Sequence, residues 1–134
     1  MRVDDEAGLR QILQQTRTIA VVGLSANPER PSYRVASYLM AHGYSVIPVN
    51  PGPSEILGKK CYPDLASVPL KIDMVDVFRK PEDVLPIARE AVRLGAKTLW
   101  LQLGVINEAA ADLAAAAGMN VVVDRCTKIE HARM

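Results

Sequence analysis

The stretch AVVGLSANPERPSYRVASYL, residues 20–39, is typical of a strand that runs through a glycine turn into a helix. Its apolar start belongs to TIAVVG (18–23), a short run rich in β-branched residues, as in strands that are buried on both faces. A helix is expected from Ser32 to His42, because apolar residues recur there at helical spacing and Gly43 is a natural stop. A strand–glycine–helix unit of this kind opens many α/β folds.

The rest of the chain repeats this alternation. Further strands are expected at 45–49, 73–78, 98–103 and 120–123, and further helices at 4–15, 80–96 and 107–117. Residues 54–71 are expected to be irregular, with a short helical turn. The pattern predicts an α/β fold, a Rossmann-like doubly wound parallel sheet of five strands with helices on both faces. Right-handed crossovers place every strand-to-helix turn at the carboxyl edge of such a sheet, where ligands bind.

Composition narrows the classes of protein. A chain of 134 residues, 49% hydrophobic and 23% charged, fits a single globular domain over residues 1–134. The net charge of +1 provides no general attraction to nucleic acid or membrane, and 4% aromatic residues leave no platform for stacking bases. We expect a cytoplasmic protein with reduced thiols, because there is no signal peptide, no apolar run that could cross a bilayer and only two cysteines.

The first turn, GLSANPERPS (23–32), carries residues suited to an anion. The N-terminus of the following helix offers free N–H groups and a favourable dipole. The turn and the start of this helix carry short polar side chains and arginines. After Gly23 and Leu24, these residues are Ser25, Asn27, Arg30, Ser32 and Arg34. Arginine forks pair well with phosphate oxygens. From these residues alone, a phosphate site and an ordinary capped loop with solvated arginines both stay open.

Two positions argue against a redox dinucleotide. The fingerprint G-x-G-x-x-G has Ser25 and Pro28 in place of its second and third glycines. Asn50 follows the strand at 45–49, where an acidic residue would hold the ribose diol. An NAD-dependent oxidoreductase is therefore the least supported function.

The turn after the third strand adds positive charge. VFRKPED (77–83) places Arg79 and Lys80 beside the start of another helix. One such pair alone is more simply a solvated basic pair. Two cationic turns on one edge of a sheet predict an anionic ligand whose phosphates lie some distance apart.

The later turns offer weaker signals. Gln102 and Gly104 end the fourth strand, where an amide side chain and bare backbone can face the polar arm of a ligand. Cys126 has Arg125 and Lys128 nearby and is either an activated thiol or a half-buried structural cysteine, which the residues alone favour. Trp100 is expected in the core. No acid–base pair, catalytic triad or metal-ligand spacing stands out, so no catalytic residue and no metal site are predicted.

Taken together, these turns resemble those of the stand-alone CoA-binding domain family. These are small bacterial and archaeal proteins similar to the N-terminal domain of the succinyl-CoA synthetase alpha subunit. The resemblance covers nearly the whole chain and is carried, in order, by VVGLSANPERPSYRVASYL, VIPVNPGPSEILGKKCYPDL, DVFRKPEDV, WLQLGV and DRCTKIEH.

The resemblance implies that coenzyme A lies across the carboxyl edge of a sheet with the strand order 3-2-1-4-5. The phosphates would meet the turn from Gly23 to Arg34. The pantetheine arm would run toward Gln102, Gly104 and the final loop. The adenosine end would lie by Asn50, Pro51, Phe78, Arg79, Lys80 and Pro81. The turns agree with this ligand, because CoA carries a diphosphate and a separate 3′-phosphate, and an asparagine at position 50 does not repel the latter.

The leading hypothesis is a module that holds CoA or an acyl-CoA without catalysis of its own. In the synthetase, the phosphorylated histidine and the nucleotide-binding machinery lie beyond the CoA domain, so acyl-CoA synthesis would need partner chains. Two alternatives stay open. One is a redox-linked protein that forms a mixed disulfide between CoA and Cys126. The other is a CoA-sensing regulatory subunit with a protein partner.

Overall fold

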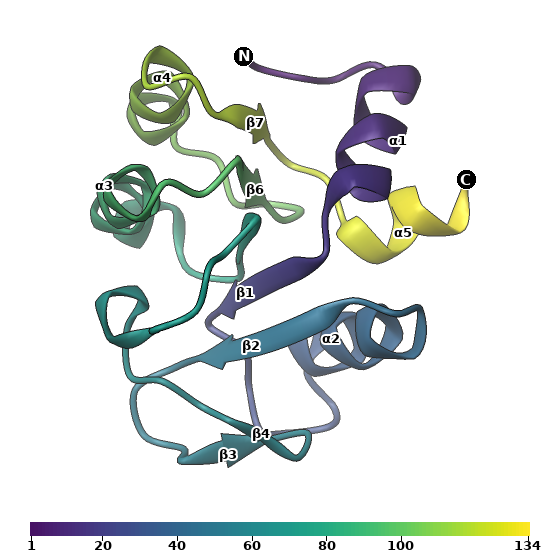
Figure 1. The fold of residues 1–134 in the computed structure, drawn as a ribbon, viewed down its shortest axis with the longest axis vertical. Helices are drawn as coiled ribbons and strands as arrows, with labels where there is room; N and C mark the ends of the chain where they lie inside the picture. Colours follow the sequence, from purple (N-terminus) through teal and green to yellow (C-terminus); the bar gives the residue numbers. More distant parts are fainter.

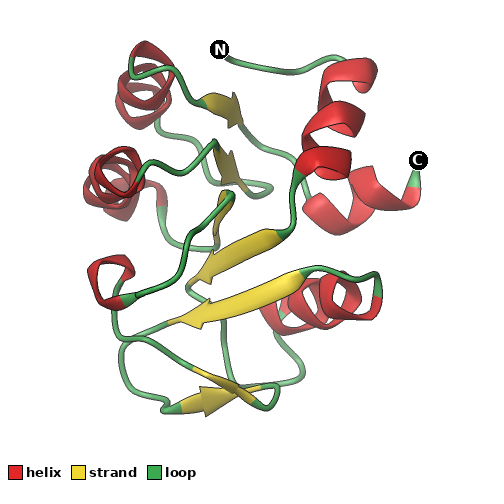
Figure 2. Cartoon of the chain, in the orientation of Figure 1, coloured by secondary structure: helices red, strands yellow, loops and turns green.

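A computed structural model describes all 134 residues, and a parallel sheet of five strands forms its centre (Figures 1 and 2). The strands are β1 (Thr18–Val22), β2 (Ser45–Val49), β5 (Met74–Val77), β6 (Thr98–Leu101) and β7 (Asn120–Val122). Their residues are buried except at three strand starts, as the continuous apolar runs predicted. The predicted Rossmann-like α/β fold is confirmed.

Helices cover both faces of this sheet (Figure 1). The helices are α1 (Glu6–Gln15), α2 (Pro31–Ala41), α3 (Val84–Leu94), α4 (Glu108–Ala116) and α5 (Thr127–Ala132). The helices α3 and α4 form one core with one side of the strands, whereas α1 and α2 form a second core with the other side. None of the helices has the length and apolar character that crossing a bilayer requires.

Local signals account for most helix ends. The side chain of Asn107 caps α4 by accepting a hydrogen bond from the Ala110 N–H at 3.0 Å, and Gly95 closes α3 in the left-handed conformation. The helix α2 begins at Pro31 rather than at Ser32, because proline is favoured in the first helical position. The helix expected over 80–96 divides into a short 3₁₀ turn, η2 (Pro81–Asp83), and α3.

The strand order is β2-β1-β5-β6-β7. Outside β2, Tyr62 forms an isolated parallel bridge with Val49, with hydrogen bonds of 3.0 Å to the Pro48 carbonyl and 2.9 Å from the Asn50 N–H. If the Tyr62 segment is counted as the third strand, the order follows the expected 3-2-1-4-5 pattern. Assigning residues 73–78 to that third, outer place is wrong, because β5 pairs directly with β1.

A hairpin and a helix were not expected. Within residues 54–71, β3 (Glu55–Ile56) and β4 (Lys59–Lys60) form the hairpin, whereas η1 (Leu65–Ser67) is the short helical turn that was expected there. The hairpin turns through Leu57 and Gly58, both at positive φ (54° and 72°). Such turns usually carry asparagine or aspartate before the glycine, so leucine hid the signal. The second unexpected element is α5, which follows the fifth strand where only a loop was foreseen.

Candidate functional site

The largest concave surface at the carboxyl edge is a cleft of about 640 Å³, named here the main cleft. It brings together many predicted ligand-binding residues from four separate turns: Gly23, Ser25, Arg30, Ser32, Phe78, Arg79, Lys80 and Gln102, together with Cys126. Four apolar residues that the sequence did not single out complete it: Pro31, Val35, Leu103 and Val105. The edge of the sheet therefore gathers residues that lie about a hundred positions apart in the chain.

Gly23 lets the two cationic turns meet. Its φ is +89°, and a Cβ at this position would lie 2.5 Å from the carbonyl oxygen of Phe78 and 3.0 Å from Cδ of Arg79. No other residue type fits there without moving the backbone of the turn after β5. The first turn thus packs directly against the second cationic turn.

Polar side chains of the first turn mostly bind their own loop. Ser32 Oγ accepts a hydrogen bond from the Ser25 N–H at 3.0 Å, and Ser25 Oγ accepts one from the Asn27 N–H at 3.0 Å. Asn27 Oδ1 in turn accepts from the Glu29 N–H at 3.0 Å, and Asn27 does not line the main cleft. The N–H of Ser32, however, has no partner within the protein. This N–H in the first turn of α2 is a donor for an anion.

The cationic side chains of the two turns differ in their exposure and in their ion pairs. Arg30 and Lys80 are exposed, line the main cleft and make no ion pair. Arg79 also lines the main cleft and is 3.4 Å from the Asp83 carboxylate. Arg34 is exposed but does not line the cleft. Three cations from two turns therefore surround this cleft.

A second hollow of about 340 Å³, named the side cleft, lies on the α3 side of the same edge. Gly23 and Arg79 line both clefts, so the two are neighbours. The side cleft has a partly apolar wall, which includes Val49 and Ile87, and it also carries the carboxylates of Asp64, Asp83 and Glu90. Its apolar part suits a flat, uncharged ring system.

Several predicted site residues face elsewhere. Leu24 is fully buried in the core, and Asn50 Nδ2 donates to the Leu24 carbonyl at 2.8 Å. The Pro81 carbonyl accepts a hydrogen bond from Asn107, and the Gly104 N–H donates to Asp124 Oδ1 at 2.7 Å. None of these four lines either cleft. They shape the turns rather than their concave surface.

A buried polar cluster lies below Gln102. Asp76 on β5 has no exposed surface and accepts hydrogen bonds from Gln102 Nε2 at 2.7 Å and from Thr127 Oγ1 at 3.1 Å. Burial raises the pKa of Asp76 to about 7, although both hydrogen bonds oppose the rise. Neither Asp76 nor Thr127 was predicted from the sequence. The signal available was an acidic residue inside the otherwise apolar strand at 73–78.

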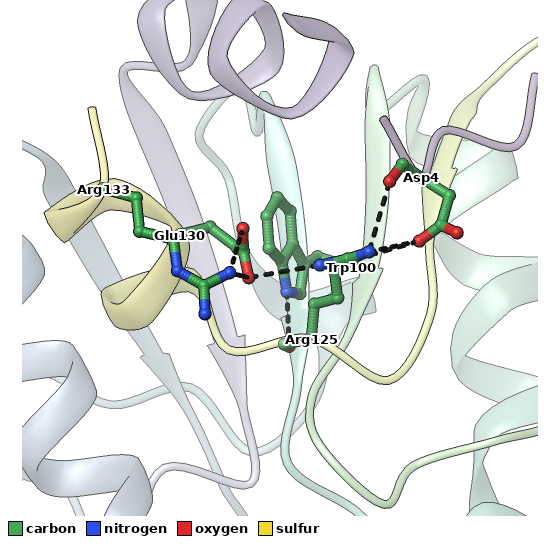
Figure 3. Close-up of polar contacts among 5 residues, drawn as sticks. All are labelled: Asp4, Trp100, Arg125, Glu130 and Arg133. Carbon is green, nitrogen blue, oxygen red and sulfur yellow. Dashed lines mark hydrogen bonds and ion pairs between the residues drawn. The ribbon is translucent and has the colours of Figure 1, made fainter. Parts of the chain in front are cut away.

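Cys126 is 8% exposed and lines the main cleft, but its cationic neighbours are engaged elsewhere. Figure 3 shows the Arg125 guanidinium between Asp4 (2.7 Å) and Glu130 (3.4 Å), while the Arg125 carbonyl accepts from Trp100 Nε1 at 2.8 Å. The Lys128 ammonium lies 5.6 Å from the centre of the Tyr38 ring. The alternative in which Arg125 and Lys128 activate this thiol therefore has no support in the contacts. Both cysteines are free.

The structure contains no group of three histidine, cysteine or acidic side chains that could hold a metal ion. The carboxyl edge offers a helix N-terminus, three cations, a partly apolar side cleft, an amide and a thiol. This combination suits a ligand with phosphates at one end and an uncharged arm at the other.

Comparison with known proteins agrees with that description. The family model of the CoA binding domain matches residues 17–132. The chain is 39% identical to the uncharacterized protein YneT of Bacillus subtilis (strain 168), with 98% of both chains covered. It is also 30% identical over 84 residues to acetate–CoA ligase [ADP-forming] II of Archaeoglobus fulgidus, where the match spans 12% of the ligase.

Solved structures share the fold. A hypothetical protein from Pyrococcus horikoshii OT3 is 42% identical, with a TM-score of 0.94 over 97% of this chain and 92% of that one. The dinucleotide-forming acetyl-coenzyme A synthetase 1 of Ca. Korarchaeum cryptofilum is 28% identical, with a TM-score of 0.67 over 78% of this chain and 25% of the synthetase. From its turns, its fold and these matches, the chain belongs to the CoA-binding domain family.

Proposed function

We propose that this protein binds coenzyme A or an acyl-CoA across the carboxyl edge of its sheet and has no catalytic activity of its own. The observation that carries the proposal is the pair of cationic turns, packed together at Gly23, that surround the main cleft in a chain of this family. CoA needs cations in two places, because its diphosphate and its 3′-phosphate are separate. The names of two relatives, an acetate–CoA ligase and an acetyl-coenzyme A synthetase, contain the same ligand.

Each part of CoA has a counterpart at the edge. We place the diphosphate at the Ser32 N–H and Arg30, where the start of α2 favours negative charge. The 3′-phosphate lies near Arg79, and the adenine ring lies in the neighbouring side cleft. The uncharged pantetheine arm then extends toward Gln102. This arrangement uses the strand order, since the turns after β1 and β5 adjoin each other and β6 lies beyond them.

Isothermal titration calorimetry tests the proposal with CoA, dephospho-CoA and NAD. We expect CoA to bind most tightly and NAD most weakly, because no acidic residue ends β2 to hold a free ribose diol. The Arg30→Ala variant should bind CoA about tenfold more weakly, as expected for loss of a charged hydrogen bond. The matched control is Arg89→Ala, since Arg89 is exposed on α3 and lines neither cleft. Equal or tighter binding of NAD than of CoA would overturn the proposal.

A second candidate function rests on the position of Cys126 in the main cleft with Gln102. If the pantetheine arm passes Gln102, its sulfur comes near Cys126. The Cys126 thiolate then attacks a sulfur of CoA disulfide, forms a protein–CoA disulfide and releases one CoA thiolate. Intact mass after incubation with CoA disulfide should show one CoA adduct, which dithiothreitol removes. An adduct that persists in Cys126→Ser would contradict this assignment.

A further inference from the structure

Asp76 is an uncommon residue to find in the middle of a sheet. Its carboxyl group is completely buried, and its only hydrogen-bond partners are two neutral side chains, Gln102 and Thr127. No lysine, arginine or histidine side chain bonds to it. Burying a carboxyl group without a cation is unfavourable, and an apolar residue would fill the strand position more stably. A buried ionisable cluster of this kind beside a cleft is a candidate functional site.

The hydrogen bonds of the cluster determine which way the Gln102 amide faces. Above a pH of about 7 the Asp76 carboxylate is ionised and only accepts hydrogen bonds, so the group 2.7 Å from it is then the amide nitrogen, Nε2. Thr127 Oγ1 donates its hydrogen to Asp76 and therefore accepts the second hydrogen of Nε2, at 3.0 Å. Turning the amide over would place its oxygen against the carboxylate with no hydrogen between them. Both amide hydrogens thus point into the protein.

The opposite end of the amide, Oε1, has no partner in the protein. Every buried side-chain nitrogen and oxygen of the chain is hydrogen-bonded, so Oε1 reaches solvent even though Gln102 is only 4% exposed. Gln102 lines the main cleft, so this cleft is the open space that its side chain adjoins. The cleft therefore presents a fixed hydrogen-bond acceptor at the end of β6.

We propose that Asp76 and Thr127 are positioning residues that hold Gln102 Oε1 toward the main cleft, where it accepts a hydrogen bond from an amide N–H of the ligand's uncharged arm. This inference rests on the proposed function, in which that arm is pantetheine, a chain with amide N–H groups. It makes Gln102 a specificity residue. The arm is recognised by a donor that it carries, whereas the phosphates are recognised by the turns after β1 and β5.

The test compares two ligands that share the nucleotide end. CoA carries the arm, and adenosine 3′,5′-bisphosphate does not. At a pH of about 8, where Asp76 is ionised, Gln102→Met should weaken CoA binding by about fivefold to tenfold, the size expected for one neutral hydrogen bond. Thr127→Val should weaken it about threefold, while Thr127→Ser, which keeps the hydroxyl, should match the wild type. Binding of adenosine 3′,5′-bisphosphate should be unchanged in all three variants.

The outcomes separate the two proposals. If wild-type protein does not bind CoA, the proposed function and this inference both fail. If it binds CoA and Gln102→Met binds CoA equally well, only the inference fails. If Thr127→Val weakens both ligands alike, the cluster has a general structural role and the positioning role is wrong. Should Gln102→Met not fold, the Thr127→Val and Thr127→Ser pair decides the question by itself.

Discussion

Gly23 shows how one residue can determine the geometry of the whole edge. It combines a positive φ with close approach of backbone from another strand, and either condition alone favours glycine. Gly43 has nearly the same φ, +93°, but open space where a Cβ would stand. The two glycines therefore separate the effect of conformation from the effect of contact.

We predict that Gly43→Ala lowers the free energy of unfolding by about 1 kcal/mol, the usual effect of a left-handed conformation on a residue with a Cβ. Gly23→Ala should lower it by about 2–4 kcal/mol, because the added Cβ also collides with the Phe78 carbonyl. Urea unfolding of the two variants and the wild type measures both values. Equal losses would mean that the contact with the turn after β5 is unimportant.

Asp76 should make stability depend on pH. Its pKa of about 7 in the folded protein lies above the ordinary value of about 3.9 in the unfolded chain. Between these values the folded protein holds a proton that the unfolded chain has lost. The free energy of unfolding due to Asp76 therefore falls as the pH rises from about 4 to about 7, and it is constant above that.

The Asp76→Asn variant removes this dependence. At a pH of about 8 its free energy of unfolding should exceed that of the wild type by about 1–4 kcal/mol, and the difference should vanish near a pH of about 4. Burial and the neighbouring His42 lower the pKa of His131, but this group affects both proteins equally, so the difference isolates Asp76. Parallel pH profiles from denaturant unfolding would contradict the prediction.

At the scale of elements, hydrophobic periodicity was enough to locate all five strands of the main sheet and the helices α1 to α4. Those segments are long and bury a complete face, so their patterns are strong. The hairpin β3–β4 and the helix α5 were missed because they are short. The hairpin also turns through Leu57, and tertiary packing rather than pattern determines such elements.

The site was predictable to the level of turns, but not to the level of side chains. Parallel topology alone brings Arg30, Arg79 and Gln102 to one edge. The sequence did not reveal that the side chains of Ser25 and Asn27 bind their own loop, or that Asp76 supports Gln102 from inside the sheet. Such hydrogen bonds depend on contacts between distant segments.

The two cationic turns should recognise different phosphates. The turn after β1 is assigned the diphosphate, and Arg79 on the turn after β5 is assigned the 3′-phosphate. We predict that Arg79→Ala weakens CoA binding about tenfold but leaves binding of dephospho-CoA nearly unchanged, while Arg30→Ala weakens both. Calorimetry of the wild type and both variants, each with CoA and with dephospho-CoA, measures these differences in affinity. If Arg79→Ala weakened both ligands equally, its charge would act on the diphosphate instead.

At the scale of the whole molecule, the N-terminal segment packs against β7 and the loop that follows it. The Val3 N–H donates to the Val121 carbonyl at 2.8 Å, and Arg125 connects the segment after β7 to Asp4. Figure 3 shows this connection beside Trp100, which is fully buried. Trp100 lies beside these contacts between distant segments. The order of the strands also depends on which segments meet in space, so it could not be read from local patterns in the sequence.

Trp100 is the only tryptophan and therefore reports unfolding of the whole domain. We predict that its fluorescence and far-UV circular dichroism change at the same temperature, as in a two-state transition. A ligand present at about 100 times its dissociation constant stabilises the folded state by about 2.7 kcal/mol, so CoA at that concentration should raise Tm by about 10 °C. NAD at the same concentration, the control, should raise it by much less. An equal shift with NAD would show that the edge recognises a dinucleotide in general and not CoA.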